Sequence, residues 1–259
     1  MAHGVAKALL FLCAGSVTHQ THKKDIREMG NLWRKMPITT CAFVIGAASL
    51  AGIPPLTGFF SKDEILLTVF ENGNPLFILI STLGIILSSL YMGRVTLIAF
   101  FGRDNNNLQD IREPGKPMAV PLIILGFLTL FMGGLVFKWG DIYPGFANFI
   151  NTSHDFHINI GVMTLSIIFS SLGLFLSILT YSANVIDPLA VSNKLSPVHQ
   201  IIVNKYYIDR FFQWIIDKAV MSFSNLVAVF DRVILNDTGV DGPALLIMRT
   251  ALKIRYFQT

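Results

Sequence analysis

Two lysines of this chain stand inside long apolar stretches, where a charged side chain is costly. Lys7 lies within the run 2–18, and His3 precedes it by four residues, one helical turn away on the same face. A lysine at membrane depth marks a functional site by default, because burial disfavours its charged form and lets it release a proton near neutral pH. Histidine titrates near neutrality in any case. The pair therefore predicts a short proton relay. The alternative is a lysine that snorkels or pairs with an acid on another helix.

The second lysine, Lys62, follows a helix-breaking segment and has Asp63 and Glu64 beside it. The segment 52–58 places two prolines and two glycines inside an apolar stretch, which predicts a broken helix at membrane depth. Non-helical backbone is tolerated there only inside protein or along a wet cavity, and broken helices mark the ion sites of transporters. Lys62 and Asp63 thus form the second candidate for an ion path. The alternative is a proline kink followed by a lysine at the outer interface.

Other reactive side chains give weaker patterns. Arg94 lies near the end of its apolar segment and is expected to snorkel toward water. The histidines show no metal-ligand spacing, and two cysteines, Cys13 and Cys41, cannot form a disulfide scaffold or a four-ligand metal site alone. The motifs CxxC, GxGxxG and GxxxxGK[ST] do not occur. We therefore expect no metal, nucleotide or iron–sulfur site in this chain.

The composition shows what kind of element positions these residues. Of 259 residues, 53% are hydrophobic and 14% are charged, against about 25% charged in a typical soluble domain. A soluble globule and a disordered chain are both excluded. Only helices and closed barrels hide their backbone polar groups in lipid, and about 20 apolar residues span it. We predict an all-α transmembrane bundle with helices over 36–61 (broken), 72–93 with an extension to 101, 117–137 and 158–186.

The net charge of +4 reports topology rather than a binding partner. Lys and Arg gather in the linkers 19–36 and 102–116 and in the tail, and are scarce in 71–75 and 138–157. By the positive-inside rule, the first two linkers and the tail are cytoplasmic. Nucleic acid is not expected as a partner.

The tail differs from the rest of the chain, so we divide the chain into 1–186 and 187–259. Its region 200–259 has a helical period but carries charge at regular intervals, with polar residues seven apart at Arg210, Asp217, Ser224 and Asp231. Such a helix lies along an interface or across other helices. We expect a long amphipathic helix over 201–236, about 54 Å in length, and a break at Gly239, Gly242 and Pro243.

Several motifs resemble a known family. Residues 3–15 are similar to the H-x-x-x-K-A-x-L-F-L-x-x-G helix of the antiporter-like membrane subunits of respiratory complex I, the NADH:quinone oxidoreductase. The stretches 51–65 (AGIPPLTGFFSKDEI) and 89–94 (SLYMGR) follow in the order found in the largest of these subunits, the chain L family. The stretch 204–209 (NKYYID) resembles the start of that family's long lateral helix, which separates it from the paralogous chains M and N.

This resemblance implies a role for each matching residue. Lys7 corresponds to the central proton-channel lysine and His3 to its relay histidine, while Lys62 corresponds to the terminal lysine on the broken helix and Asp63 to the acid beside it. The implied function is proton translocation coupled to quinone reduction elsewhere in the complex. NADH, FMN, iron–sulfur clusters and quinone are expected in other subunits, and no cofactor in this chain. The implied partners are other membrane subunits, contacted through 201–259, and the lipid bilayer of a bacterial inner membrane or an equivalent energy-transducing membrane.

Two other functions remain open. The same lysine motifs serve multisubunit Na⁺/H⁺ antiporters and membrane-bound hydrogenases, so the ion could include Na⁺. A structural remnant, with a clamp helix and an inactive half-channel, is the other alternative. The resemblance also implies the C-terminal part of a longer subunit, because the family's first half-channel would precede Met1 and its closing helix would follow Thr259.

Overall fold

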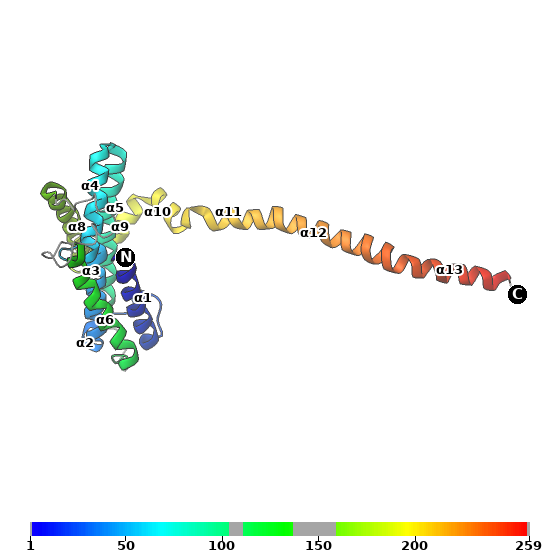
Figure 1. Ribbon diagram of the computed structural model, residues 1–259, viewed down its shortest axis with the longest axis horizontal. Coiled ribbons are helices and arrows are strands. Elements are labelled where there is room, and N and C mark those ends of the chain that lie inside the picture. Colours follow the sequence, from blue (N-terminus) through cyan, green and yellow to red (C-terminus); the bar gives the residue numbers. More distant parts are fainter. Residues whose placement is uncertain (1, 104–110, 137–158, 258–259) are drawn as a thin grey trace. The chain divides into compact units, whose positions relative to one another are not determined.

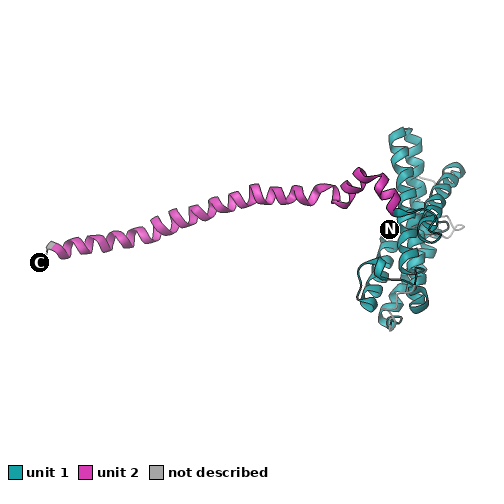
Figure 2. Ribbon diagram, turned by 180° about the vertical axis from the view of Figure 1, so that it is seen from behind, with its two compact units in different colours: residues 1–188 teal, residues 189–259 magenta. Residues whose placement is uncertain are grey.

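The computed structural model describes residues 2–103, 111–136 and 159–257. These residues form helices and their connections, with no strand in the described ranges, which confirms the predicted all-α class (Figure 1). The chain groups into two compact units, residues 1–188 and 189–259 (Figure 2). The role assigned to each part of the chain stays a prediction, as does the external position of the linker 138–157, which lies outside the described residues.

The helices of the first unit begin and end at residues suited to those positions. Proline occupies the first turn of three of them, where its missing N–H has no partner to lose, and in the helix that begins at Pro75 the side chain of Asn74 also accepts the Leu76 N–H. The elements are α1 (Ala2–Thr21), η1 (Ile26–Glu28), α2 (Leu32–Lys35), α3 (Pro37–Ala51), α4 (Thr57–Asn72), α5 (Pro75–Ala99), α6 (Lys116–Phe131), η3 (Met132–Val136) and α8 (Ile160–Tyr181).

The predicted break in the second apolar stretch is confirmed. Helix α3 ends at Gly52, whose φ of +83° is left-handed and whose N–H bonds to the carbonyls of Ala48 and Ser49. Residues 53–56 are not helical, and α4 begins at Thr57. The stretch 36–61 is therefore two helices joined by a short irregular segment.

Small residues let the helices pack closely. Helix α1 packs against α3 and α6, and α5 runs along α8. On α5, a Cβ added to Gly93 would lie 2.5 Å from Ser177 Oγ of α8; on α8, a Cβ added to Gly173 would lie 2.3 Å from the Ile86 carbonyl oxygen. Inside a lipid bilayer the hydrophobic effect does not drive helices together, so close van der Waals packing between small residues helps to hold them in contact.

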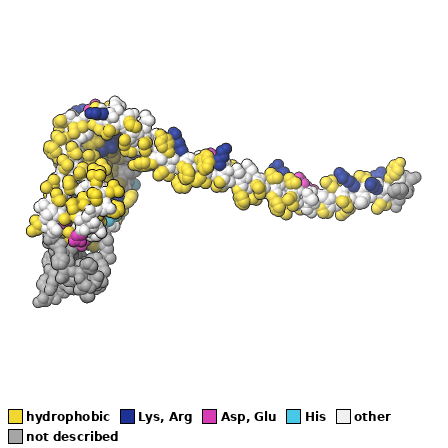
Figure 3. Space-filling view, turned by 90° about the horizontal axis from the view of Figure 1, so that it is seen from above, with side chains coloured by type: hydrophobic (Ala, Val, Ile, Leu, Met, Phe, Trp, Pro, Cys, Tyr) yellow, Lys and Arg dark blue, Asp and Glu magenta, His cyan; other side chains and the backbone are white. Residues whose placement is uncertain are grey.

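The outer surface of the first unit is apolar. Side chains such as Phe11, Phe77, Phe127 and Phe175 are more than half exposed, and Figure 3 shows hydrophobic side chains over much of this unit. In the first unit, the helical stretches Pro75–Ala99, Lys116–Gly134 and Ile160–Tyr181 are long and apolar enough to cross a membrane. This surface is suited to lipid.

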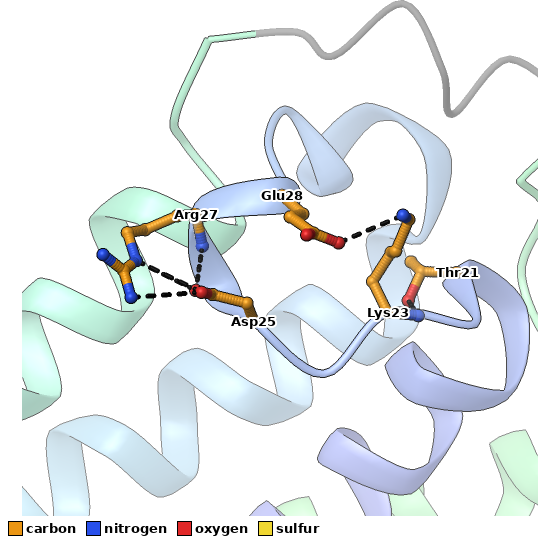
Figure 4. Close-up of polar contacts among 5 residues, drawn as sticks. All are labelled: Thr21, Lys23, Asp25, Arg27 and Glu28. Carbon is orange, nitrogen blue, oxygen red and sulfur yellow. Dashed lines mark hydrogen bonds and ion pairs between the residues drawn. The ribbon is translucent and has the colours of Figure 1, made fainter.

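The connection from α1 to α2 is fixed by local polar contacts (Figure 4). The Asp25 carboxylate accepts the backbone N–H of Arg27 at 2.9 Å and Nε of the same residue at 3.2 Å. These bonds to Arg27 hold the pKa of the Asp25 carboxyl below its ordinary value. Lys23 and Glu28 form an ion pair at 3.0 Å. These contacts hold η1 in place at its start and at its end.

A carboxylate from the linker before α6 caps the start of α3. Glu113 accepts the backbone N–H groups of Ile38 and Thr39 at 3.0 Å each, and the Thr39 hydroxyl at 2.6 Å. A negative charge at a helix N-terminus also interacts favourably with the helix dipole. Glu113 thus joins two segments that are far apart in the sequence.

The second unit contains one long helical stretch. The elements of this unit are α9 (Pro188–Lys194), α10 (Ser196–Val203), η4 (Lys205–Tyr207), α11 (Ile208–Ile215), η5 (Ile216–Val220), α12 (Met221–Phe230), η6 (Asp231–Asp241) and α13 (Gly242–Phe257). The stretch Lys205–Tyr256 has 52 residues, roughly 78 Å at 1.5 Å per residue. In Figure 3, basic side chains gather mainly along one edge of it and hydrophobic ones along the other.

Two predictions about this helix are wrong. It does not start at Ile201, because three consecutive residues, Lys205 to Tyr207, have left-handed φ values of 51–58° and separate α10 from α11. It does not break at Gly239, Gly242 or Pro243 either. Residues 231–241 form a π-helical segment that runs directly into α13, so Pro243 stands in the first turn of α13, where a proline is tolerated.

Replacing Glu113 with Ala should loosen the start of α3. Losing a helix cap costs about 0.5–2 kcal/mol, so the thermal unfolding temperature of the purified chain in detergent should fall. Arg112→Ala, at the exposed neighbouring position, is the matched control. Equal melting temperatures for the two variants would show that Glu113 does not anchor α3.

Candidate functional site

Lys62 lies at the break between α3 and α4 and is held by two acceptors. Its Nζ donates to the backbone carbonyl of Leu50, near the end of α3, and to Ser88 Oγ of α5 at 2.8 Å. Ser88 in turn donates to the Ile85 carbonyl at 2.9 Å. The lysine is half-buried. One titratable amine thus connects three helices at the point where the backbone is irregular.

The position of Lys62 follows from how α3 ends. The last carbonyls of a helix have no partner within the helix and carry partial negative charge, so a cation is favoured beside them. Gly52 leaves room for the approach: a Cβ there would lie 3.2 Å from Lys62 Cδ. The break therefore supplies both the acceptor and the space.

Hydroxyl groups satisfy the irregular backbone around the break. Ser49 Oγ accepts the Gly58 N–H at 3.1 Å and lies 3.2 Å from Thr57 Oγ1. The Thr57 hydroxyl is directed at the Thr129 carbonyl of α6, at 3.4 Å. Sequence analysis did not identify these hydroxyls or Ser88. The available signal was a set of buried Ser and Thr residues in apolar helices next to a break.

Asp63 stands next to Lys62 but does not pair with it. No ion pair joins them in the described ranges, and the buried Oδ1 of Asp63 has no hydrogen-bond partner among those residues. Adjacent residues on a helix do not face each other. An unpaired carboxylate oxygen in a dry site is costly, so Asp63 is suited to binding water or a group from another chain.

The predicted relay on α1 has the expected spacing. His3 is exposed and Lys7 is half-buried, one turn apart on the same helix. Neither makes a hydrogen bond or an ion pair within the part of the chain that the structure describes, and Lys7 makes no direct polar contact with Lys62 there. Transfer between them would require water, and the relay stays a prediction.

The remaining candidates take no part in this site. Arg94 lies over the ring of Tyr181, with its Cζ 5.5 Å from the centroid. His19, His22 and His199 are exposed. Among the described residues, no three His, Cys, Asp or Glu side chains are grouped closely enough to hold a metal ion.

Comparison with known sequences gives consistent matches. Residues 1–88 match a family described as "NADH:quinone oxidoreductase/Mrp antiporter, TM". NADH-quinone oxidoreductase subunit L of Rickettsia bellii is 31% identical over 93% of the chain and 40% of the relative. NAD(P)H-quinone oxidoreductase subunit 5 of the Chlorokybus atmophyticus chloroplast is 32% identical over 82% of the chain and 36% of the relative. The chain spans about 40% of the length of these relatives.

Two solved structures share the fold. The Mrp complex from Dietzia sp. DQ12-45-1b matches all of the chain and 27% of its own, with a TM-score of 0.57 and 20% identity. An archaeal membrane-bound sulfane sulfur reductase matches 98% of the chain and 46% of its own, with a TM-score of 0.60 and 21% identity. At these identities, the matches establish the fold alone.

Gly52 and Gly73 offer a matched test of the space around Lys62. Both have positive φ at a helix end, so an alanine costs about 1–2 kcal/mol of backbone strain at either position. Only at Gly52 would the new methyl group meet Lys62, because nothing lies within 4 Å of a Cβ at Gly73. We expect a larger fall in melting temperature for Gly52→Ala, measured in detergent. A fall no larger than that of Gly73→Ala would contradict the close packing.

Proposed function

Because the chain belongs to the antiporter-like membrane subunits of the NADH:quinone oxidoreductase and Mrp antiporter family, we propose that it translocates protons as a subunit of an NADH:quinone oxidoreductase. It is an integral, multi-pass membrane protein. Quinone reduction, with NADH, FMN and iron–sulfur clusters, takes place in other subunits. This chain carries no redox centre and contributes the proton path.

The observation that supports this proposal best is the environment of Lys62. A titratable amine lies at a helix break in an apolar bundle, between a helix-terminal carbonyl and a serine hydroxyl. The acceptors stabilise the protonated form, while the surrounding apolar side chains disfavour it. A small change in either of these two effects, such as a shift of Ser88 away from Nζ, would change the proton affinity of Lys62. Lys62 is therefore suited to loading and releasing a proton.

The path that we propose uses the four predicted residues. A proton reaches Lys7 through His3 and water, passes through water to Lys62, and leaves on the outer side with Asp63 as the acceptor. Charge movement in neighbouring subunits gates the path by shifting the proton affinity of the lysines. The unpaired oxygen of Asp63 is consistent with a group that binds water on the exit side.

The long helix of the second unit is proposed to contact other membrane subunits. None of its described residues is buried, and it exposes large apolar side chains such as Phe211, Phe223 and Phe230. An apolar face of this length marks an interaction surface. The membrane is proposed to be a bacterial inner membrane or an equivalent energy-transducing membrane.

A second function is favoured by the breadth of the matching family, which includes Mrp antiporters. In that case the chain would belong to a multisubunit Na⁺/H⁺ antiporter or to a membrane-bound hydrogenase. Proteoliposomes that contain the assembled complex, measured with and without Na⁺, distinguish the oxidoreductase from the antiporter. Proton uptake that requires NADH and is independent of Na⁺ supports the oxidoreductase, while exchange driven by a Na⁺ gradient supports the antiporter.

Replacing Lys62 with Ala should lower proton uptake per NADH oxidised by roughly tenfold or more. Electron transfer should persist in part, because the redox chemistry lies elsewhere. Adding Ser61→Lys to Lys62→Ala should not restore uptake, because moving the lysine by one position along the helix turns its side chain by about 100°. Lys116→Ala, at an exposed lysine at the start of α6, is the control. An unchanged proton-to-electron ratio in Lys62→Ala would remove Lys62 from the path.

Lys7→Ala should abolish most proton uptake by the assembled complex. Lys7→Arg should do similar damage, because arginine keeps its proton. The measurement is proton uptake by proteoliposomes, with assembly checked by the size of the purified complex. Near-normal uptake in the arginine variant would show that Lys7 does not titrate during turnover.

Photo-crosslinkers along the long helix test the proposed partners. At the apolar positions Phe211 and Phe223 they should capture other membrane subunits in the intact complex, and at the polar position Asp217 they should capture few. If every position captures only this chain, the bridging role is wrong.

A further inference from the structure

An open crevice lies on the first unit between α3, α5 and α8. It has a volume of about 200 Å³, and small residues form much of its wall: Ala47, Ala48, Ala51 and Gly93. Larger aliphatic side chains complete it, among them Val44 and Ile178, which are partly exposed at the outer surface. The crevice therefore opens where the surface is suited to lipid.

Water is a poor occupant for this crevice. A buried water needs two to four polar partners. The lining offers two hydroxyls, and that of Thr96 already donates to the Met92 carbonyl at 2.8 Å. Ser177 Oγ is fully buried and has no partner among the described residues. A space in the hydrocarbon core that water does not fill takes an apolar chain.

A cation stands at one end of the crevice. Gly93 of α5 lies opposite Ser177 of α8, so Tyr181 lies one turn further toward the C-terminal ends of both helices. Arg94 reaches the ring of Tyr181, so its side chain runs toward those ends. Arg94 shares a face with the crevice residue Leu97, three positions later. These positions place the guanidinium near the end of the crevice that the charge pattern predicts to be cytoplasmic, although Arg94 itself is not part of the lining.

No carboxylate among the described residues pairs with Arg94. Arg94 is the only charged residue of α5, and it makes no ion pair in the ranges that the structure describes. Its charge acts on Asp25, but the Asp25 carboxylate is already bound by Arg27. A guanidinium matches the geometry of a phosphate, with two parallel hydrogen bonds. The arginine is thus available to an anion that approaches from the membrane.

We propose that this crevice is a binding site for an anionic phospholipid of the cytoplasmic leaflet. One acyl chain lies between α3, α5 and α8, and Arg94 holds the phosphate at the headgroup level. Basic side chains at the cytoplasmic ends of helix pairs bind anionic headgroups in this way.

The test uses the full chain purified in detergent and stripped of lipid. It is titrated with phosphatidylglycerol or with phosphatidylcholine of the same acyl chains, and bound lipid is counted by native mass spectrometry. We expect one phosphatidylglycerol per chain, bound roughly fivefold more tightly than phosphatidylcholine. Arg94→Gln should remove this preference, and Arg94→Lys should keep most of it. Arg103→Gln, in an exposed linker, is the control and should change nothing.

A second variant fills the crevice itself. Ala48→Leu should abolish binding of both lipids, while Ala14→Leu, at an exposed position on α1, should not. Equal binding of both lipids to the native chain would overturn the proposal, as would a preference that survives Arg94→Gln. In native membranes, a photo-crosslinker at position 48 should label lipid. Capture of a protein subunit alone would assign the crevice to a partner helix and would also overturn the proposal.

Discussion

The structure depends on one constraint: backbone polar groups in hydrocarbon must find partners inside the protein. The break after Gly52 frees carbonyls at the end of α3 in the middle of an apolar bundle. Lys62 binds one of them, that of Leu50, while the hydroxyl of Ser49 accepts the Gly58 N–H on the other side of the break. The lysine is therefore part of the solution to the break, and the break is what makes a lysine tolerable there.

The surrounding helices are arranged around this junction. The close contact of α5 with α8, through Gly93 and Gly173, fixes the helix that carries Ser88, the second acceptor of Lys62. Glu113 fixes the other end of α3 by capping its first turn. A proton carrier needs acceptors held at defined distances, because its proton affinity changes steeply with their position. Rigid elements on both sides of an irregular segment meet that requirement.

Much of this could be predicted from the sequence, because prolines, glycines and charged residues stand out against an apolar background. The helix break and the two lysines were visible in this way. The partners of Lys62 were not, because a backbone carbonyl has no signature and Ser88 resembles any other small helix residue. The continuous helix through Pro243 is not predicted for a different reason: a π-helical segment is defined by i→i+5 hydrogen bonds of the backbone, and single-residue propensities do not encode them.

The central claim is that the end of α3 holds the Lys62 amine. Solid-state NMR of the chain in lipid bilayers, with ¹⁵N on the lysine side chains and ¹³C on the leucine carbonyls, tests this contact directly. We predict dipolar transfer between Lys62 Nζ and the Leu50 carbonyl carbon, lost in Lys62→Ala and weakened in Gly52→Ala. A fully labelled native sample without this transfer would contradict the account, because the lysine would then lie away from the break.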